Sequence, residues 1–161
     1  MAEVSFANPA ALRIAFAASA LSILLDFSPF LNFLFIIWSM LAGFAAVWMF
    51  RKRTGRPLSV SSGAKLGWIT GVFTFVILTV LVTADALLSG GKFAEEFHQA
   101  MRQQMQTTWA HDPNYQQMLS TLDNPATFAA AIVFLMIFIF VLLSLASVAG
   151  GALGARLSNK E

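Results

Sequence analysis

The stretch of residues 125–155, PATFAAAIVFLMIFIFVLLSLASVAGGALGA, is dominated by apolar residues and contains no charged side chain. A helix needs about 20 predominantly apolar residues to cross about 30 Å of hydrocarbon. The stretch therefore predicts a membrane-spanning helix. Two further stretches, 30–50 and 64–88, meet the same requirement, because no charged residue lies between Phe27 and Phe50 or between Leu66 and Ala84.

A fourth apolar stretch, 9–27, is interrupted by charge near both ends. Arg13 and Asp26 leave only the residues from Ile14 to Leu25 uncharged. Arg13 can place its charge at one interface while its apolar stem stays in the hydrocarbon, and Asp26 can lie at the other interface. We expect this stretch to span, with a re-entrant or surface helix as the alternative. A cleaved signal peptide is not expected, because no basic residue precedes Arg13.

The composition agrees with a membrane protein. The 161 residues are 58% hydrophobic and 11% charged, whereas a soluble domain usually carries about 25% charged residues. The chain has no cysteine, which excludes disulfides, thiol nucleophiles and cysteine-ligated metal sites. The sequence predicts an all-α polytopic membrane protein, residues 1–161 forming a single membrane domain with four transmembrane helices and a short amphipathic helical outer loop at 89–124.

The distribution of basic residues predicts the orientation in the membrane. The densest basic run contains Arg51, Lys52, Arg53 and Arg56, and cytoplasmic loops retain such residues. With four spans, both termini are then also cytoplasmic, and of the ten basic residues only Lys92 and Arg102 lie outside. The same run has a second interpretation, since it could bind anionic lipid head groups. A net charge of +2 is too small to indicate nucleic acid as a partner.

Small residues recur every fourth position in two of the predicted spans. Gly63, Gly67 and Gly71 begin the third span, and Ala146, Gly150 and Gly154 end the fourth. Such rows lie on one helix face and let two backbones approach closely in lipid. We expect the two rows to pack against each other within the chain, with homo-oligomerisation through one row as the alternative.

Apolar residues in the outer loop follow a helical period. Phe93, Phe97, Met101, Met105 and Trp109 are spaced four apart, which predicts an amphipathic helix whose apolar face serves as an outer contact surface. Three pairs of residues predict helix starts, each with a capping side chain followed by proline at the first helical position. Asp112 and Pro113 begin a second short outer helix. The other two pairs begin the first and fourth spans, and they are Asn8 with Pro9 and Asn124 with Pro125. His98, Met101 and Met105 could bind Cu(I), but no compact Met-x-Met or His-x-His pair supports this, so we predict no metal and no cofactor.

No catalytic motif is recognisable. The sequence contains no His-Glu-x-x-His, no Gly-x-Ser-x-Gly and no phosphate-binding loop, and no ionisable residue lies deep in a predicted span, as a coupled transporter would need. We therefore expect a non-enzymatic structural or accessory component, a homo-oligomer or a subunit beside a membrane partner. A small oligomeric channel or facilitator lined by Ser and Thr is the alternative. A third class, an outer-leaflet enzyme, would depend on Asp85, His98 or His111.

Three segments resemble a known group of proteins. They are GAKLGWITG at 63–71, QQMQ at 103–106 and GGALGARL at 150–157. On these segments the chain, from about Ser61 onward, resembles a family of uncharacterised small bacterial inner-membrane proteins with four spans, some of which carry a zinc-ribbon ahead of the membrane part. The resemblance implies a bacterial inner-membrane location. It implies no activity, and without cysteine the zinc-ribbon is missing.

Overall fold

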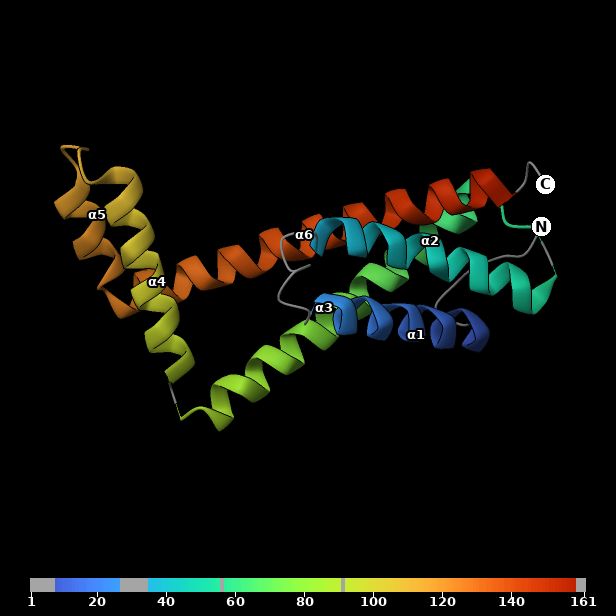
Figure 1. Cartoon of the computed structure of the whole chain (residues 1–161), viewed down its shortest axis with the longest axis horizontal. Helices are drawn as coiled ribbons and strands as arrows, with labels where there is room; N and C mark the ends of the chain where they lie inside the picture. Colours follow the sequence, from blue (N-terminus) through green and yellow to red (C-terminus); the bar gives the residue numbers. More distant parts are fainter. Residues whose placement is uncertain (1–7, 27–34, 56, 91, 159–161) are drawn as a thin grey trace. The chain divides into compact units, whose positions relative to one another are not determined.

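The computed structural model describes residues 8–26, 35–55, 57–90 and 92–158, and helices are the only regular secondary structure within them (Figure 1). The helices are α1 (Pro9–Asp26), α2 (Phe35–Thr54), α3 (Val60–Leu88), α4 (Lys92–Trp109), α5 (Tyr115–Leu122) and α6 (Pro125–Ser158). The all-α prediction is confirmed. The third and fourth predicted spans are longer than expected, since α3 begins before Ala64 and α6 continues beyond Ala155. Residues 30–34, with which the second predicted span began, lie outside the described residues.

Asparagine caps begin two of the apolar helices. The Oδ1 atom of Asn8 accepts a hydrogen bond from the amide of Ala10 at 3.1 Å, and Oδ1 of Asn124 accepts one from the amide of Ala126 at 3.0 Å. Each cap satisfies an amide that has no partner inside the helix, and the proline that follows lacks an amide altogether. Both predicted helix starts are confirmed.

The predicted start of the short outer helix is wrong by two residues. Oδ1 of Asp112 accepts a hydrogen bond from the amide of Asn114 at 2.7 Å, which forms a turn around Pro113 rather than a helix N-cap. The helix α5 begins only at Tyr115. An aspartate that folds back on the backbone two residues later is a common competitor of capping.

The chain forms two compact units. Unit 1 comprises residues 1–79 and 138–161, and unit 2 comprises residues 80–137, so that α3 and α6 each contribute to both. In unit 1, α1, α2, the first part of α3 and the last part of α6 form a four-helix bundle. The start of α1, the end of α2, the start of α3 and the end of α6 lie at the same end of this bundle (Figure 1). We call it the basic end, because it carries the exposed cations Lys52, Arg53, Lys65 and Arg156.

The core of unit 1 is built mainly from small and medium-sized residues. Ala11, Ala15 and Ala18 of α1 are buried together with Val47 and Phe50 of α2 and with Leu66 and Ile69 of α3. The rings of Phe16 and Phe73 meet edge to face with centroids 5.9 Å apart. Small residues let the helices approach closely, and the larger residues fill the remaining space.

Two helices are long and apolar enough to cross a membrane among the residues described. These are α3, with a mean hydropathy of 2.2, and α6, with a mean hydropathy of 3.0 in its most apolar window. Only 11% of the residues in each window are buried, so neither helix is enclosed like the core helix of a soluble domain. The helices α1 and α2 do not pass the same test, and four spans are therefore not established by length and composition alone.

Candidate functional site

The glycine row of α3 packs directly on the backbone of α6. A Cβ atom added at Gly63 would lie 2.5 Å from the carbonyl oxygen of Gly151 and 2.5 Å from the Cβ of Ala155. One added at Gly67 would lie 2.9 Å from the carbonyl carbon of Ser147, and one at Gly71 would lie 2.9 Å from the Cα of Ser144. Real Cβ atoms essentially never approach this closely, so this contact needs glycine at all three positions.

The glycines of α6 that we predicted to face this row instead face α2. A Cβ added at Gly150 would clash with the backbone carbonyl of Met40, lying 2.7 Å from its carbon atom, and one at Gly154 would lie 3.2 Å from the Cβ of Val47. The α6 residues that meet α3 are Ser144, Ser147, Gly151 and Ala155, one step around the helix. The expected packing of the third and fourth spans on each other within the chain is confirmed, but it uses this neighbouring row of α6 and not the row of Ala146, Gly150 and Gly154. Ala146 is only half-buried. Two adjacent faces of α6 carry small residues, and each contacts a different helix.

Gly43 of α2 was missed by the sequence analysis. A Cβ added there would lie 2.9 Å from the carbonyl carbon of Ser147 and 3.0 Å from the amide nitrogen of Gly151. A signal for it was present in the sequence, since Ser39 and Gly43 are small residues four apart in the uncharged stretch 30–50. Together, Gly43, Gly63, Gly67, Gly71, Gly150, Gly151 and Gly154 form what we call the small-residue interface.

Buried serine hydroxyls form hydrogen bonds between helices of the same bundle. Oγ of Ser147 donates to the carbonyl oxygen of Ser39 at 3.0 Å, which joins α6 to α2. Oγ of Ser19 lies 2.9 Å from the carbonyl oxygen of Thr70, joining α1 to α3, and 2.8 Å from that of Ala15. Without water, such a hydroxyl finds its acceptor on a neighbouring backbone. These hydroxyls are directed at carbonyl groups inside one chain, so they lend the channel alternative no support.

Three other buried hydroxyls have no hydrogen-bond partner in the part of the chain that the structure describes. They belong to Ser22, Ser39 and Ser144. A buried polar group without a partner is uncommon and calls for an explanation.

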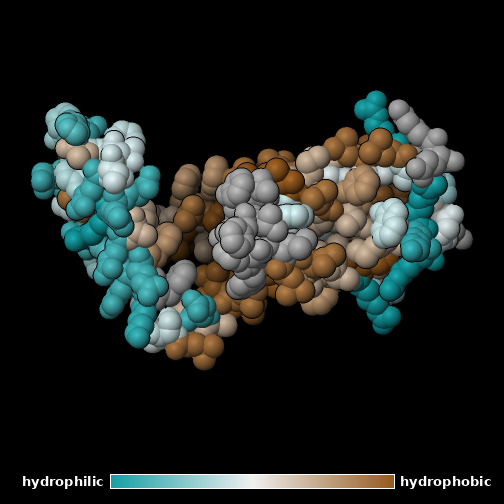
Figure 2. All heavy atoms as spheres, viewed as in Figure 1, coloured by the Kyte–Doolittle hydropathy of each residue, from teal (hydrophilic) through white to brown (hydrophobic). Residues whose placement is uncertain are grey.

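The basic run forms the last turn of α2. Arg51, Lys52 and Arg53 lie there, and the Nζ atom of Lys52 lies 5.1 Å from the ring centroid of Trp48. An aromatic ring beneath an ammonium group attracts it electrostatically and holds it at the helix end. Arg56 lies outside the described residues. On the face of unit 1 seen in Figure 2, hydrophilic side chains gather at the basic end and apolar ones cover the helices away from it.

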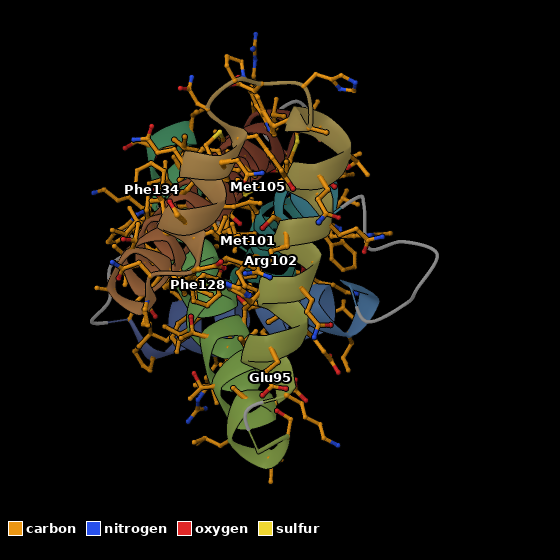
Figure 3. All side chains as sticks on the ribbon, turned by 90° about the vertical axis from the view of Figure 1, so that its left-hand side faces the viewer. Glu95, Met101, Arg102, Met105, Phe128 and Phe134 are labelled. Carbon is orange, nitrogen blue, oxygen red and sulfur yellow. The ribbon has the colours of Figure 1, made fainter. Side chains whose placement is uncertain are left out.

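Much of the predicted outer contact face is covered by unit 2 itself. The ring of Phe97 lies 6.1 Å from that of Phe128 in α6, and Met105 lines a hollow of about 340 Å³ with Met118 and Leu122. Figure 3 shows Met101 and Met105 along α4. Trp109 is 47% exposed, and the side chain of Phe93 lies outside the described part. Phe97 and Met105 are therefore half-buried against neighbouring helices of unit 2, and the use of the row as an outer contact surface stays a prediction.

An ion pair joins α4 to the segment that follows α5. Nε of Arg102 donates to Oδ1 of Asp123 at 3.0 Å, and a terminal guanidinium nitrogen contacts the same oxygen. The hydrogen bond from Arg102 lowers the pKa of Asp123, and the carboxylate in turn raises the pKa of Arg102. Nε2 of His98 lies 3.5 Å from the same Oδ1 atom, and its ring stacks edge to face on Phe128. These contacts hold α4 against the end of α5 and the start of α6, which is a structural role.

The residues described contain no group of three or more His, Asp or Glu side chains that could hold a metal ion. His98 lies against Asp123 and Phe128, while His111 is exposed on the turn between α4 and α5.

Comparisons with protein-family models, with characterised proteins and with solved structures found no match for the chain. The resemblance to four-span bacterial membrane proteins therefore stays a prediction.

Proposed function

We propose that this chain is an integral protein of a bacterial inner membrane, in which α1, α2, α3 and α6 span the bilayer. The basic end faces the cytoplasm together with both termini, and α4 and α5 form a polar lobe outside. In this membrane the protein is a non-enzymatic structural or accessory component, held together by its small-residue interface.

The exposed apolar surface of α3 and α6 carries this proposal. In α6 the side chains of Val133, Phe134 and Ile137 are 59%, 72% and 57% exposed, and Leu145 is 62% exposed. Soluble monomers rarely expose large apolar patches. In hydrocarbon the same surface needs no cover, because lipid tails are its solvent.

The positions of the charges support four spans rather than two. Every cation described in unit 1 lies near the basic end, and Arg13 and Lys65 are each within about two turns of the start of their helix. α1 and α2 pack on each other and on the two longer helices. Short apolar helices with charge only at their ends can span with the help of long basic side chains.

The small-residue interface supports a structural role. Its glycines are used in contacts between helices of the same chain, so it builds the protein's own bundle. A membrane partner would therefore contact other surfaces, such as the exposed apolar face of α6 or the polar lobe of α4 and α5.

Extraction and native mass spectrometry test the proposal in two steps. Membranes from cells that express the tagged protein are washed with alkaline carbonate, and the protein should stay in the pellet. After gentle detergent extraction, we expect a stoichiometric second polypeptide in the complex. Release into the carbonate supernatant would overturn the membrane assignment. A partner-free protein that carries solute flux in liposomes would overturn the accessory role.

A further inference from the structure

A hollow of about 280 Å³ lies between α2 and α6 near the basic end of unit 1. Its lining consists of one face of each helix, with Phe44, Trp48 and Arg51 from α2 and Gly154, Leu157 and Ser158 from α6. Gly154 lets the two helices lie close together here, since a Cβ atom added to it would lie 3.3 Å from the carbonyl oxygen of Phe44.

The lining changes from apolar to polar toward the basic end. Phe44 lies seven residues before Arg51, about 10 Å along the helix. Arg51 belongs to the last turn of α2, and Ser158 is the last residue of α6. Between these levels, the side chains of Trp48 and Leu157 are 55% and 54% exposed. A ligand that fits therefore has a polar group beside Arg51 and an apolar chain that runs toward Phe44.

The charge around the hollow is positive. Arg51, Lys52 and Arg53 form the last turn of α2, and Arg156 belongs to the last turn of α6. The Nζ atom of Lys52 lies 5.1 Å from the ring centroid of Trp48, which lines the hollow. No Asp or Glu lies at the basic end among the residues described. Two helix C-termini contribute about half a negative charge each, which these four cations outweigh. The polar group of the ligand is therefore an anion.

We infer that this hollow binds an anionic phospholipid of the cytoplasmic leaflet, with its phosphate at Arg51 and one acyl chain along Trp48 and Phe44. The inference rests on the proposed membrane function, which places the basic end in that leaflet. A guanidinium group can donate two parallel hydrogen bonds to a phosphate, and basic pockets between membrane helices on this side suit anionic head groups. A free phosphate ion would leave the apolar wall uncovered.

Fluorescence quenching tests this site, because Trp48 is part of its lining. The full chain in a non-ionic detergent is titrated with phosphatidylglycerol brominated on its acyl chains, and separately with brominated phosphatidylcholine. We expect quenching by phosphatidylglycerol to saturate near one lipid per chain, and phosphatidylcholine to require a severalfold higher concentration. Trp48→Phe should remove the saturable part. The matched control Trp68→Phe replaces another exposed tryptophan of unit 1 and should keep it.

Two pairs of variants distinguish this hollow from the basic end as a whole. Arg51→Gln should raise the phosphatidylglycerol concentration at half-saturation about fivefold, the effect of one cation beside anionic lipid. Lys65→Gln removes an exposed cation of α3 at the same end and should change it much less. Ser158→Asp places a negative charge in the lining and should also weaken binding, whereas Ser61→Asp, on an exposed position of α3, should have little effect. The second pair keeps the test decisive if Arg51→Gln fails to fold.

Several results would overturn the inference. They are quenching that never saturates, equal half-saturation by the two lipids, a saturable part that survives in Trp48→Phe, and equal effects of the two members of each charge pair. Saturable quenching that appears only after residues 159–161 are deleted would also overturn it, since the end of the chain would then fill the hollow. Failure of the membrane assignment would appear separately, as release into the carbonate wash.

Discussion

Gly150 lies where α6 meets α2, and the nearest atoms to a side chain there belong to the backbone of Met40. A rotamer change can move a side chain out of the way, but it cannot move a carbonyl group. Alanine usually adds about 1 kcal/mol of helix stability over glycine, while overpacking a close contact typically costs about 1–3 kcal/mol. At Gly150 and Gly67 we expect the steric cost to exceed the gain in helix propensity.

The replacements Gly150→Leu and Gly67→Leu should therefore lower the thermal unfolding midpoint of the detergent-solubilised protein markedly, with the Ala variants in between. Ala149→Leu adds more side chain at the neighbouring, exposed position and should leave the midpoint nearly unchanged. Equal midpoints for Gly150→Leu and Ala149→Leu would show that α6 does not pack on α2 through this face.

Asp123 is the residue whose charge state affects the outer lobe. Its pKa is lowered in the folded protein by the hydrogen bond from Arg102, so the contact stabilises the lobe above the ordinary pKa of an aspartate. This contribution is lost as the pH falls through the lowered value. Because both groups are exposed to solvent, the effect on stability is small.

An NMR titration of the Asp123 carboxyl carbon measures this directly. The midpoint in the wild-type protein should lie below the midpoint in Arg102→Gln, which removes the donor. Identical midpoints in the two proteins would mean that the ion pair does not form in solution.

At the scale of helices, interhelical hydrogen bonds from serine should contribute measurably. Ser147→Ala removes the donor to the Ser39 carbonyl, and such bonds in membrane proteins are worth about 0.6 kcal/mol on average. Ser144→Ala, three residues earlier in α6, removes a hydroxyl that has no partner and should cost less or nothing. The comparison is made from unfolding free energies in mixed micelles. A larger loss for Ser144→Ala than for Ser147→Ala would contradict the assignment.

The elements that the sequence predicted well depend on local signals. The long uncharged runs predicted α3 and α6, and the asparagine–proline pairs at Asn8 and Asn124 predicted two helix starts. The start of α5 was misplaced, because Asp112 can form a turn or cap a helix with the same side-chain hydrogen bond. Local chemistry did not distinguish the two.

The pairing of helices could not be predicted from the same signals. Gly150 and Gly154 lie on one face of α6, and Ser147, Gly151 and Ala155 lie on the adjacent face. Both faces are small enough for close packing, so the sequence leaves open which of them meets α3. That choice depends on where α2 packs. Because the sequence did not show that α2 contacts α6, the role of Gly43 in this contact was not predicted either. The neighbours of α4 could not be predicted for the same reason, since its apolar residues indicate a contact face without naming Phe128 as the neighbour of Phe97.

At the scale of the whole molecule, surfaces that are all exposed in the isolated chain have different surroundings in the proposed topology. In the proposed topology, Ser61 at the start of α3 and Ser120 in α5 lie in water on opposite sides of the membrane, whereas Phe134, 72% exposed in α6, faces lipid. Because the chain contains no cysteine, single cysteines can report on each position without interference.

The most direct measurement is the labelling of Ser61→Cys, Ser120→Cys and Phe134→Cys with a membrane-impermeant maleimide in intact spheroplasts. We expect the Ser120→Cys variant to react at once and the Ser61→Cys variant to react only after the membrane is permeabilised. The Phe134→Cys variant should react in neither case until the protein is denatured. Rapid reaction at position 134 in the native protein, or reaction at 61 and 120 from the same side, would contradict the proposed membrane topology.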